Sequence, residues 1–241
     1  MMYKKVSSNR PDNGSNTEGL RNKNSVCPQI IVNPQPQRKH LPSVESKAKR
    51  VLDILGALVG LTITAILCIF IAPAIYFDDP GPIFFSQTRI GLQGRSFRIW
   101  KFRSMVKDAE KYQHLVLNEA QGYIFKNEND PRVTRMGAIL RKTSLDELPQ
   151  FLNVLKGDMS LVGTRPPTPD EVSQYLPHHF QRLDVKPGLT GEWQVNGRSM
   201  VKDFEEIVKM DLLYQQQWSL SYDLKLIFKT VLVVLTKKGA C

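Results

Sequence analysis

Residues 54–77 read ILGALVGLTITAILCIFIAPAIYF, a run of 24 residues without a charged side chain. As a helix this run would be about 36 Å long, whereas the hydrocarbon core of a bilayer is about 30 Å thick. A buried core helix of a water-soluble domain usually carries a polar stripe and ends sooner. The run therefore predicts an N-terminal helix that is inserted into a lipid bilayer.

Basic residues flank the apolar run on both sides. Lys49 and Arg50 precede it, and Arg89 and Arg95 follow it. Basic flanks favour the cytoplasmic side of a membrane. Symmetric flanks therefore favour a re-entrant helix, with both ends in the cytosol, over a helix that spans the bilayer. Pro73 could kink such a helix.

The first 46 residues differ in composition from the rest of the chain. They contain five prolines and a single aromatic residue, Tyr3. This segment has too little apolar surface to offset the entropy lost on ordering, so it is predicted to be a disordered arm. The arm is also basic, because residues 1–50 hold ten Lys/Arg and three Asp/Glu.

The charge outside this arm is modest. The whole chain has a net charge of +10, with 33 Lys+Arg and 23 Asp+Glu, so residues 51–241 contribute 23 − 20 = +3. A basic nucleic-acid-binding domain is therefore not expected, and no nucleic-acid partner is predicted. Cys27, Cys68 and Cys241 are an odd number of widely spaced cysteines. They form neither a disulfide framework nor a zinc pattern, which fits a reducing, cytosol-facing compartment.

Short strand and helix signals follow the apolar run. Residues 78–82 read DDPGP, a turn signal, and two short strands are expected at 83–85 and 97–100 around a glycine loop at 91–94. These strands predict a β-hairpin. Helices are expected over 103–118 and from about Ser144 to Lys156, with a stop at Gly157. The predicted fold class is α+β and mostly helical.

The C-terminal stretch 221–238 has an amphipathic pattern. Its apolar positions share one helical face and its lysines supply positive charge; the apolar residues are Leu224, Ile227, Phe228, Val231, Leu232 and Leu235. Such a helix could lie in a membrane interface beside anionic headgroups. It could equally pack its apolar face on the core of the domain.

Residues 141–150 read RKTSLDELPQ and allow two interpretations. Ser144 and Glu147 have the spacing of a capping box, which starts a helix. Alternatively, Arg141 and Lys142 beside a helix N-terminus form a place where phosphate could bind. Their positive field would favour an ionised Asp146, and an ionised carboxylate can attack phosphorus. Glu147 would add a second carboxylate suited to a divalent cation.

A second cluster of polar residues lies further along the chain. Arg165 and Pro166 form a turn, and residues 187–198 form a loop that contains Trp193, Gln194 and Arg198. Arginines on rigid turns, with an amide and an aromatic ring nearby, could hold a nucleotide diphosphate through bidentate contacts and stacking. Two ordinary surface loops would have the same composition.

Taken together, these motifs resemble the bacterial sugar transferases called monotopic polyprenyl-phosphate phosphoglycosyl transferases. The resemblance covers about residues 47–241. The segments that carry it are Lys49-Arg50-x-x-Asp53, Gly81–Phe85 with Gln87, Lys101–Met105, Asp130–Thr134, Leu140–Gln150, Asn153–Ser160, Arg165-Pro166, Pro187–Arg198, Asp211 and Asp223–Lys225.

The resemblance implies a specific chemistry. In this family an aspartate attacks the β-phosphate of a UDP-sugar, releases UMP, and passes the phospho-sugar to polyprenyl phosphate. By this resemblance Asp146 is the nucleophile and Glu147 its acidic partner, and Mg²⁺ is held by Asp146 and Glu147. The other substrate-binding residues that it implies are Lys101, Arg141, Arg165, Pro166, Gln194, Arg198 and Asp211.

The resemblance also implies a place in the cell. The family's membrane segment re-enters on the cytosolic face of the bacterial inner membrane, commonly through a central Ser-Pro; here the corresponding residues are Thr64-Ala65-Ile66. The expected organisation is an arm over 1–46, a membrane segment over 47–80 and a catalytic region over 81–241 that faces the cytosol.

The expected partners are a UDP-sugar, undecaprenyl phosphate and the lipid bilayer. The sequence specifies neither the sugar nor the oligomeric state. The alternative function is a non-catalytic membrane scaffold that recruits polysaccharide enzymes through its basic arm.

Overall fold

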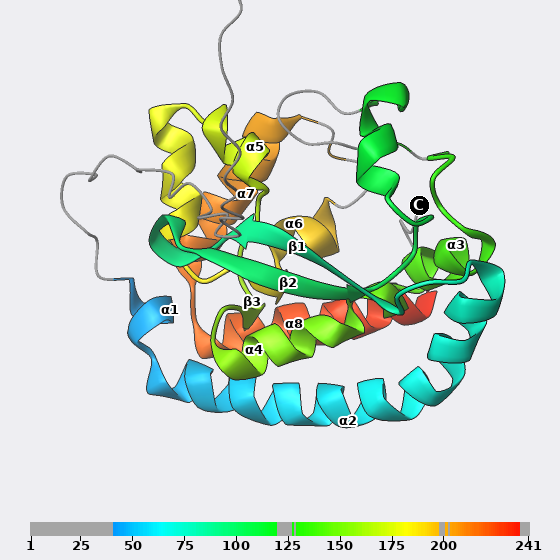
Figure 1. Ribbon diagram of the computed structural model, residues 1–241. Helices are drawn as coiled ribbons and strands as arrows, with labels where there is room; N and C mark the ends of the chain where they lie inside the picture. The colour runs from blue at the N-terminus through cyan, green and yellow to red at the C-terminus, as the bar shows by residue number, and fades with distance from the viewer. Residues whose placement is uncertain (1–40, 120–126, 128, 198–200, 202, 237–241) are drawn as a thin grey trace, which may run out of the picture.

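The computed structural model describes residues 41–119, 127, 129–197, 201 and 203–236 (Figure 1). Residues 1–40 lie outside this part, so the disorder predicted for them stays a prediction. Within the predicted arm, Pro42–Glu45 form the short helix α1. The prediction of a disordered arm is therefore wrong for residues 42–45.

The apolar run lies within one long helix, α2 (Lys47–Asp78), of 32 residues. The Ser46 side chain starts it by accepting a hydrogen bond from the Lys49 amide. Pro73 lies inside this helix, where its missing N–H and its ring weaken the preceding turn. Figure 1 shows α2 running along one side of the molecule and changing direction towards its C-terminal end.

The two faces of α2 have different surroundings. A stripe spaced mostly three or four residues apart is buried along the whole helix: Lys49, Asp53, Ala57, Gly60, Thr64, Ile71 and Ile75. The outer face is exposed and apolar: Val51, Leu55, Leu58, Val59, Ile63, Ile66, Ile69, Phe70, Tyr76 and Phe77. By length and composition α2 could cross a membrane. Helix α2 is therefore the candidate for the predicted membrane-inserted helix. Its predicted re-entrant topology stays a prediction.

The predicted hairpin is confirmed, with longer strands than expected. Strand β1 (Phe84–Ile90) pairs antiparallel with β2 (Ser96–Phe102). The connection contains the short 3₁₀ turn η1 (Leu92–Gly94), in which Gln93 and Gly94 take the left-handed conformation. In Figure 1 the hairpin crosses the middle of the molecule, with α2, α4 and α8 below it and α5, α6 and α7 above it.

The helix predicted over 103–118 is wrong for most of its length. Only the 3₁₀ element η2 (Ala109–Leu115) forms there. Helix α3 (Arg135–Lys142) comes next, and the Thr134 hydroxyl caps it by accepting from the Gly137 amide. Gly137 is required because a Cβ there would lie 1.9 Å from the Ser104 carbonyl oxygen. This close approach sets α3 against the end of the hairpin.

The single α-helix predicted over 144–156 is also wrong in its first half. Leu145–Gln150 form the 3₁₀ helix η3, and only Phe151–Lys156 form the α-helix α4. Pro149 contributes to the difference, because it has no N–H to donate to the Leu145 carbonyl oxygen, as an α-helix would require. The predicted stop at Gly157 is confirmed, with a left-handed φ of 91°.

The remaining elements complete a mostly helical α+β fold, as predicted. Strands β3 (Ser160–Val162) and β4 (Gly188–Thr190) pair in parallel. The helices are α5 (Pro169–Ser173), η4 (Pro177–Asp184), α6 (Glu192–Asn196), α7 (Phe204–Gln217) and α8 (Leu220–Thr236).

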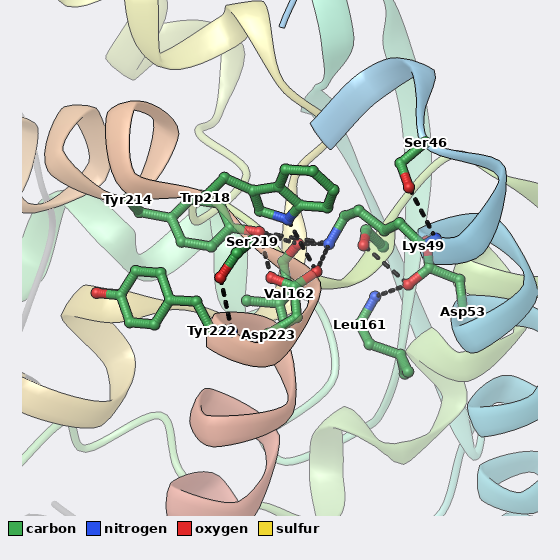
Figure 2. A network of polar contacts seen from close by, with 11 residues as sticks. Ser46, Lys49, Asp53, Leu161, Val162, Tyr214, Trp218, Ser219, Tyr222 and Asp223 are labelled. Carbon is green, nitrogen blue, oxygen red and sulfur yellow. Dashed lines mark hydrogen bonds and ion pairs between the residues drawn. The ribbon is translucent and has the colours of Figure 1, made fainter. Parts of the chain in front are cut away.

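A buried polar network joins the start of α2 to the start of α8 (Figure 2). The Lys49 ammonium lies 2.5 Å from Asp223 Oδ2 and 3.0 Å from the Val162 carbonyl oxygen. Tyr214 and Trp218 also donate to the Asp223 carboxylate. Four elements, α2, β3, α7 and α8, are thereby held at one point.

Most of the described residues of the amphipathic stripe of α8 face outwards, whereas Ile227 packs against the buried core. Leu224, Phe228, Val231 and Leu232 are exposed, whereas Leu226 and Asp223 are buried. The core-facing interpretation is therefore wrong for these four residues. Their exposure favours the alternative, an interfacial helix.

Candidate functional site

The predicted catalytic pair lies where α3 gives way to η3. Ser144 has a φ of 57° between the two elements, and this left-handed residue turns the chain so that Asp146 and Glu147 fall in the first turn of η3. The Ser144 side chain does not cap this helix, so the capping-box interpretation is wrong. Asp146 is only 7% exposed, whereas the Glu147 side chain is 40% exposed.

The hairpin supplies a cation to this pair. Lys101, on β2, places its Nζ 2.7 Å from Glu147 Oε1. Asn153 of α4 fixes the strand beside the catalytic turn, because it accepts from the Trp100 amide at 3.2 Å and donates to the Arg98 carbonyl oxygen at 2.7 Å. Three predicted site residues, Lys101, Asp146 and Glu147, are thus brought together.

Helix α2 supports the same segment. The Thr64 hydroxyl lies 3.3 Å from the Leu148 carbonyl oxygen. Leu67 and Cys68 of α2 pack with Leu145 and Leu148 in one apolar cluster. The position of Asp146 relative to α2 is therefore set by direct packing.

Burial is the largest influence on the Asp146 carboxyl, and the pKa of Asp146 is raised to about 6. Lys101 and Arg141 lower this pKa, and the neighbouring Glu147 raises it. The expected effect of neighbouring cations, which favours an ionised Asp146, is present, but burial outweighs it. A carboxyl with a pKa of about 6 is still roughly nine-tenths ionised at pH 7. Asp146 is thus a poorly solvated anion, the state in which a carboxylate attacks most readily.

The donor set at the pair fits a divalent cation. Asp146 and Glu147 are adjacent carboxylates that repel each other, as the effect of Glu147 on the pKa of Asp146 shows. Mg²⁺ is usually bound by one or two carboxylates together with substrate phosphates. Glu147 is accessible from solvent, so these two residues could hold Mg²⁺ beside a bound diphosphate.

The second predicted cluster is assembled by the parallel strands. The Arg165-Pro166 turn follows β3, and α6 follows β4. Because the two strands are parallel, both segments leave the sheet at the C-terminal ends of its strands. Gly163 allows the close approach, because a Cβ there would lie 2.2 Å from the Lys186 carbonyl oxygen. The loops therefore lie side by side although 20 or more residues separate them in sequence.

Arg165 lies between an acid and an aromatic ring. Its Nη1 is 3.3 Å from each carboxylate oxygen of Glu171, and its guanidinium carbon is 6.0 Å from the centre of the Trp193 ring. In the adjacent residue, Gln194 Oε1 is buried and has no hydrogen-bond partner in the described part of the chain. These groups could contact a nucleotide, and the binding roles of Arg165, Pro166 and Gln194 stay predictions.

Within the described part of the chain, one predicted site residue, Asp211, is engaged in a separate contact. Asp211 is buried and pairs with Arg182, whose Nε and Nη2 lie 2.7 Å from its Oδ2. The structure thus places Asp211 in an internal ion pair, and substrate contact by this residue stays a prediction. Arg198 lies outside the described residues.

Sequence reasoning missed the roles of Arg89 and Glu171. Glu171 holds Arg165, and Arg89 Nη1 donates to the Pro166 carbonyl oxygen at 3.0 Å. The register of the hairpin carried a usable signal for Arg89, because strand alternation puts it on the face of Lys101. The spacing of Thr168 and Glu171 signals a capping box at the start of α5, but it does not indicate the contact with Arg165.

A separate cluster of possible metal ligands contains His178, His179 and Glu205. His178 is exposed, whereas His179 is fully buried. His179 Nδ1 accepts from the Leu176 amide, so its Nε2 carries the proton and donates to Glu205 at 2.7 Å. With both nitrogens engaged, His179 serves as a structural residue.

Comparison with known proteins finds similarity over most of the chain. The profile of the family described as "Bacterial sugar transferase" matches residues 44–237. Galactosyl transferase CpsE of Streptococcus agalactiae serotype III is 55% identical over 195 residues, which cover 80% of this chain and 43% of that protein. Exopolysaccharide production protein ExoY of Rhizobium meliloti is 42% identical over 199 residues, 80% of this chain and 88% of that protein.

A third relative is the UDP-glucose:undecaprenyl-phosphate glucose-1-phosphate transferase of Escherichia coli K12. It is 42% identical over 209 residues, which cover 83% of this chain and 43% of that protein. The chain thus spans less than half the length of two of these relatives and most of the third. The family profile covers most of the chain and includes both candidate clusters, so the predicted membership is confirmed: this chain belongs to the bacterial sugar transferase family.

Proposed function

We propose that this protein transfers a sugar 1-phosphate from a UDP-sugar to undecaprenyl phosphate and releases UMP, and that it thereby starts the assembly of an exopolysaccharide or a related glycan. The observation that carries the proposal is the buried, poorly solvated Asp146 beside Lys101, Arg141 and Glu147. Relatives named for undecaprenyl-phosphate sugar transfer support the substrate class.

The first step forms a covalent intermediate. An Asp146 carboxylate oxygen bonds to the β-phosphorus of the donor, and the bond from that phosphorus to the oxygen bridging the two phosphates breaks. UMP leaves with this oxygen and its electron pair. Lys101 and Arg141 offset the charge that gathers on the phosphate oxygens during the step.

The second step regenerates the enzyme. A phosphate oxygen of undecaprenyl phosphate bonds to the same phosphorus, and the bond to Asp146 breaks. The carboxylate returns to its starting state, and the product is a polyprenyl-diphosphate sugar. Mg²⁺ held by Asp146 and Glu147 would supply neutralisation of the diphosphate charge.

Both ends of α2 bind the same catalytic region, which supports a re-entrant helix. At its start, Arg50 donates to the carbonyl oxygens of Val154 and Leu155 at 2.8 and 2.7 Å. At its end, Asp78 accepts from the Met136 amide at 2.8 Å. A helix held at both ends by one domain has its two ends on one side of the membrane. In this proposal that side is the cytosolic face of the bacterial inner membrane.

The exposed apolar face of α2 then contacts lipid, together with the outward stripe of α8. This arrangement places the catalytic turn next to the bilayer, since η3 packs directly on α2. One substrate is soluble in water and the other has its phosphate at the membrane surface. A site at this depth is accessible to both.

The test uses the full chain in lipid nanodiscs with Mg²⁺, undecaprenyl phosphate and a panel of UDP-sugars that includes glucose, galactose and their N-acetylated forms. We expect UMP release with at least one donor and a matching lipid-linked product by mass spectrometry. With the donor alone, we expect a mass increase of one sugar phosphate on the peptide that contains Asp146.

Failure of the folded protein to release UMP from every donor would contradict the proposal and favour the membrane scaffold. UMP release without a mass increase on Asp146 would support the transfer of a sugar phosphate but contradict a covalent intermediate on Asp146. Cysteine labelling of both sides of α2 from outside intact cells would detect a spanning helix if only one side reacted.

A further inference from the structure

One face of the hairpin carries three polar side chains, Lys101, Gln87 and Arg89. The proposed chemistry uses only the first of them. The register pairs Phe85 with Lys101 and Arg89 with Phe97. Because side chains alternate along a strand, Lys101, Gln87 and Arg89 lie on the same face. Lys101 contacts the catalytic pair, and Arg89 contacts the Arg165-Pro166 turn. The row thus connects the two clusters of the site.

The bonds of Arg89 are made to neutral oxygens. Its Nη1 donates to the Pro166 carbonyl oxygen at 3.0 Å, and its Nη2 donates to Gln87 Oε1 at 2.9 Å. Its Nε is buried and has no acceptor in the part of the chain that the structure describes. Within the same residues, Arg89 makes no ion pair with a carboxylate.

A second cation lies beside it. Burial and then the positive charge of Arg165 lower the pKa of Arg89 to about 10, and the charges of Glu171 and Glu147 oppose this shift. Glu171 is already paired with Arg165, and Glu147 with Lys101. A poorly solvated guanidinium with neutral partners and a neighbouring cation is unfavourable in the free protein. A bound dianion would relieve both the desolvation and the repulsion.

We infer that Arg89 binds the diphosphate of the nucleotide-sugar donor together with Arg165, at the phosphate that leaves with the nucleotide. This inference rests on the proposed function. Lys101 and Arg141 act at the phosphorus that Asp146 attacks, and Arg89 acts at the neighbouring phosphate. The planar guanidinium can donate two parallel hydrogen bonds to phosphate oxygens, which an ammonium cannot do.

Binding of UDP, UMP and uridine to the full chain in nanodiscs tests the assignment. The variants are Arg89→Gln and Arg89→Lys. Arg98→Gln is the matched control, because Arg98 lies on the partner strand, is exposed and donates to the Ser86 hydroxyl. We expect Arg89→Gln to weaken UDP binding roughly 10- to 100-fold, as for loss of a charge-assisted hydrogen bond. Arg89→Lys should lose less, and Arg98→Gln should bind like the wild type.

Phosphate selectivity separates ligand contact from loop support. If Arg89 contacts phosphate, uridine binding is unchanged in Arg89→Gln. An equal loss for uridine and UDP, or unchanged UDP binding, would overturn the assignment. Arg89-dependent UDP binding by a protein that releases no UMP would reject the proposed function and keep the nucleotide site. If Arg89→Gln releases UMP and binds UDP normally, the assignment of Arg89 is rejected and the proposed function is retained.

Discussion

Asp146 and Asp223 are both buried carboxylates, and each has a lysine nearby. They differ in the hydrogen-bond donors that they receive. Asp223 accepts from Lys49 at 2.5 Å, Tyr214 at 2.8 Å and Trp218 at 3.0 Å. Asp146 receives no side-chain donor within the described residues, because Lys101 pairs with Glu147 instead.

Under the proposed function, this difference separates a structural carboxylate, Asp223, from a reactive one, Asp146. A buried carboxylate with three donors has its charge compensated and its oxygens occupied, so it holds elements together. A buried carboxylate without them keeps its lone pairs available and has a raised pKa, at a cost to stability. The chain thus contains a complete polar network at one end of α2 and an incomplete one at the catalytic turn.

The largest expected effect comes from removing the reactive carboxylate. Asp146→Asn should reduce UMP release by roughly 10³-fold or more, because an amide cannot act as the nucleophile that forms the proposed intermediate. It should also stabilise the protein by about 1 to 3 kcal/mol at pH 7, since the ionised carboxylate is unfavourable where it is buried. UMP assays and thermal unfolding measure the two effects.

Asp170→Asn is the control for this comparison, because Asp170 is an exposed carboxylate on α5. It should change neither activity nor stability measurably. Near-normal turnover of folded Asp146→Asn would remove Asp146 from the role of nucleophile. A marked loss of stability in the same variant would show that its carboxylate is compensated, like that of Asp223.

The next effect concerns the complete network. Lys49→Met leaves the buried Asp223 without its cation and should destabilise the protein by about 3 to 5 kcal/mol. The double variant Lys49→Met/Asp223→Leu removes both charges and should recover much of this loss. Urea unfolding of the purified proteins measures both values. If Lys49→Met unfolds like the wild type, the network does not hold α2 to the catalytic region.

The pH dependence sharpens the contrast at the catalytic turn. Because the pKa of Asp146 is raised to about 6, the reactive carboxylate is protonated as the pH falls through 6. UMP release in the first step should fall about tenfold per pH unit below this value and level off above it. Rapid-quench assays between pH 5 and 8, with unfolding monitored in the same buffers, test this expectation. A constant rate down to pH 5 would mean that burial does not control the ionisation of Asp146.

The smallest effect is expected at the other end of α2. Asp78 is exposed, and it accepts from the Met136 amide near the N-terminus of α3. This hydrogen bond lowers the pKa of Asp78. Asp78→Ala should cost about 0.5 to 1 kcal/mol, the typical value of a helix cap, and Asp78→Asn should cost less. Thermal unfolding measures both, and a loss as large as that of Lys49→Met would indicate that this end carries a second essential anchor.

Local patterns account for much of the fold. The apolar run predicts α2, the alternation around the glycine loop predicts the hairpin, and Gly157 ends α4 as expected. The prediction of one α-helix over 144–156 failed because a capping-box pattern describes only local spacing. The left-handed Ser144 and the missing N–H of Pro149 impose a 3₁₀ turn instead.

The site divides in the same way. Lys101, Asp146 and Glu147 could be predicted because their motifs are specific, and the structure brings them together. The placement of Asp211 against Arg182 could not be predicted, since the two residues lie 29 positions apart. Arg89 was missed for a related reason, because its importance depends on a turn that lies 77 positions further along the chain.

The sequence by itself determined the residue types: an apolar helix long enough for a bilayer, a carboxylate pair between cations, and arginine-bearing turns. These are properties of neighbouring residues, and short-range patterns record them. Only the tertiary structure decided which carboxylate is left without donors and which is compensated. That outcome depends on how segments distant in sequence exclude water from one group and direct hydrogen-bond donors to another.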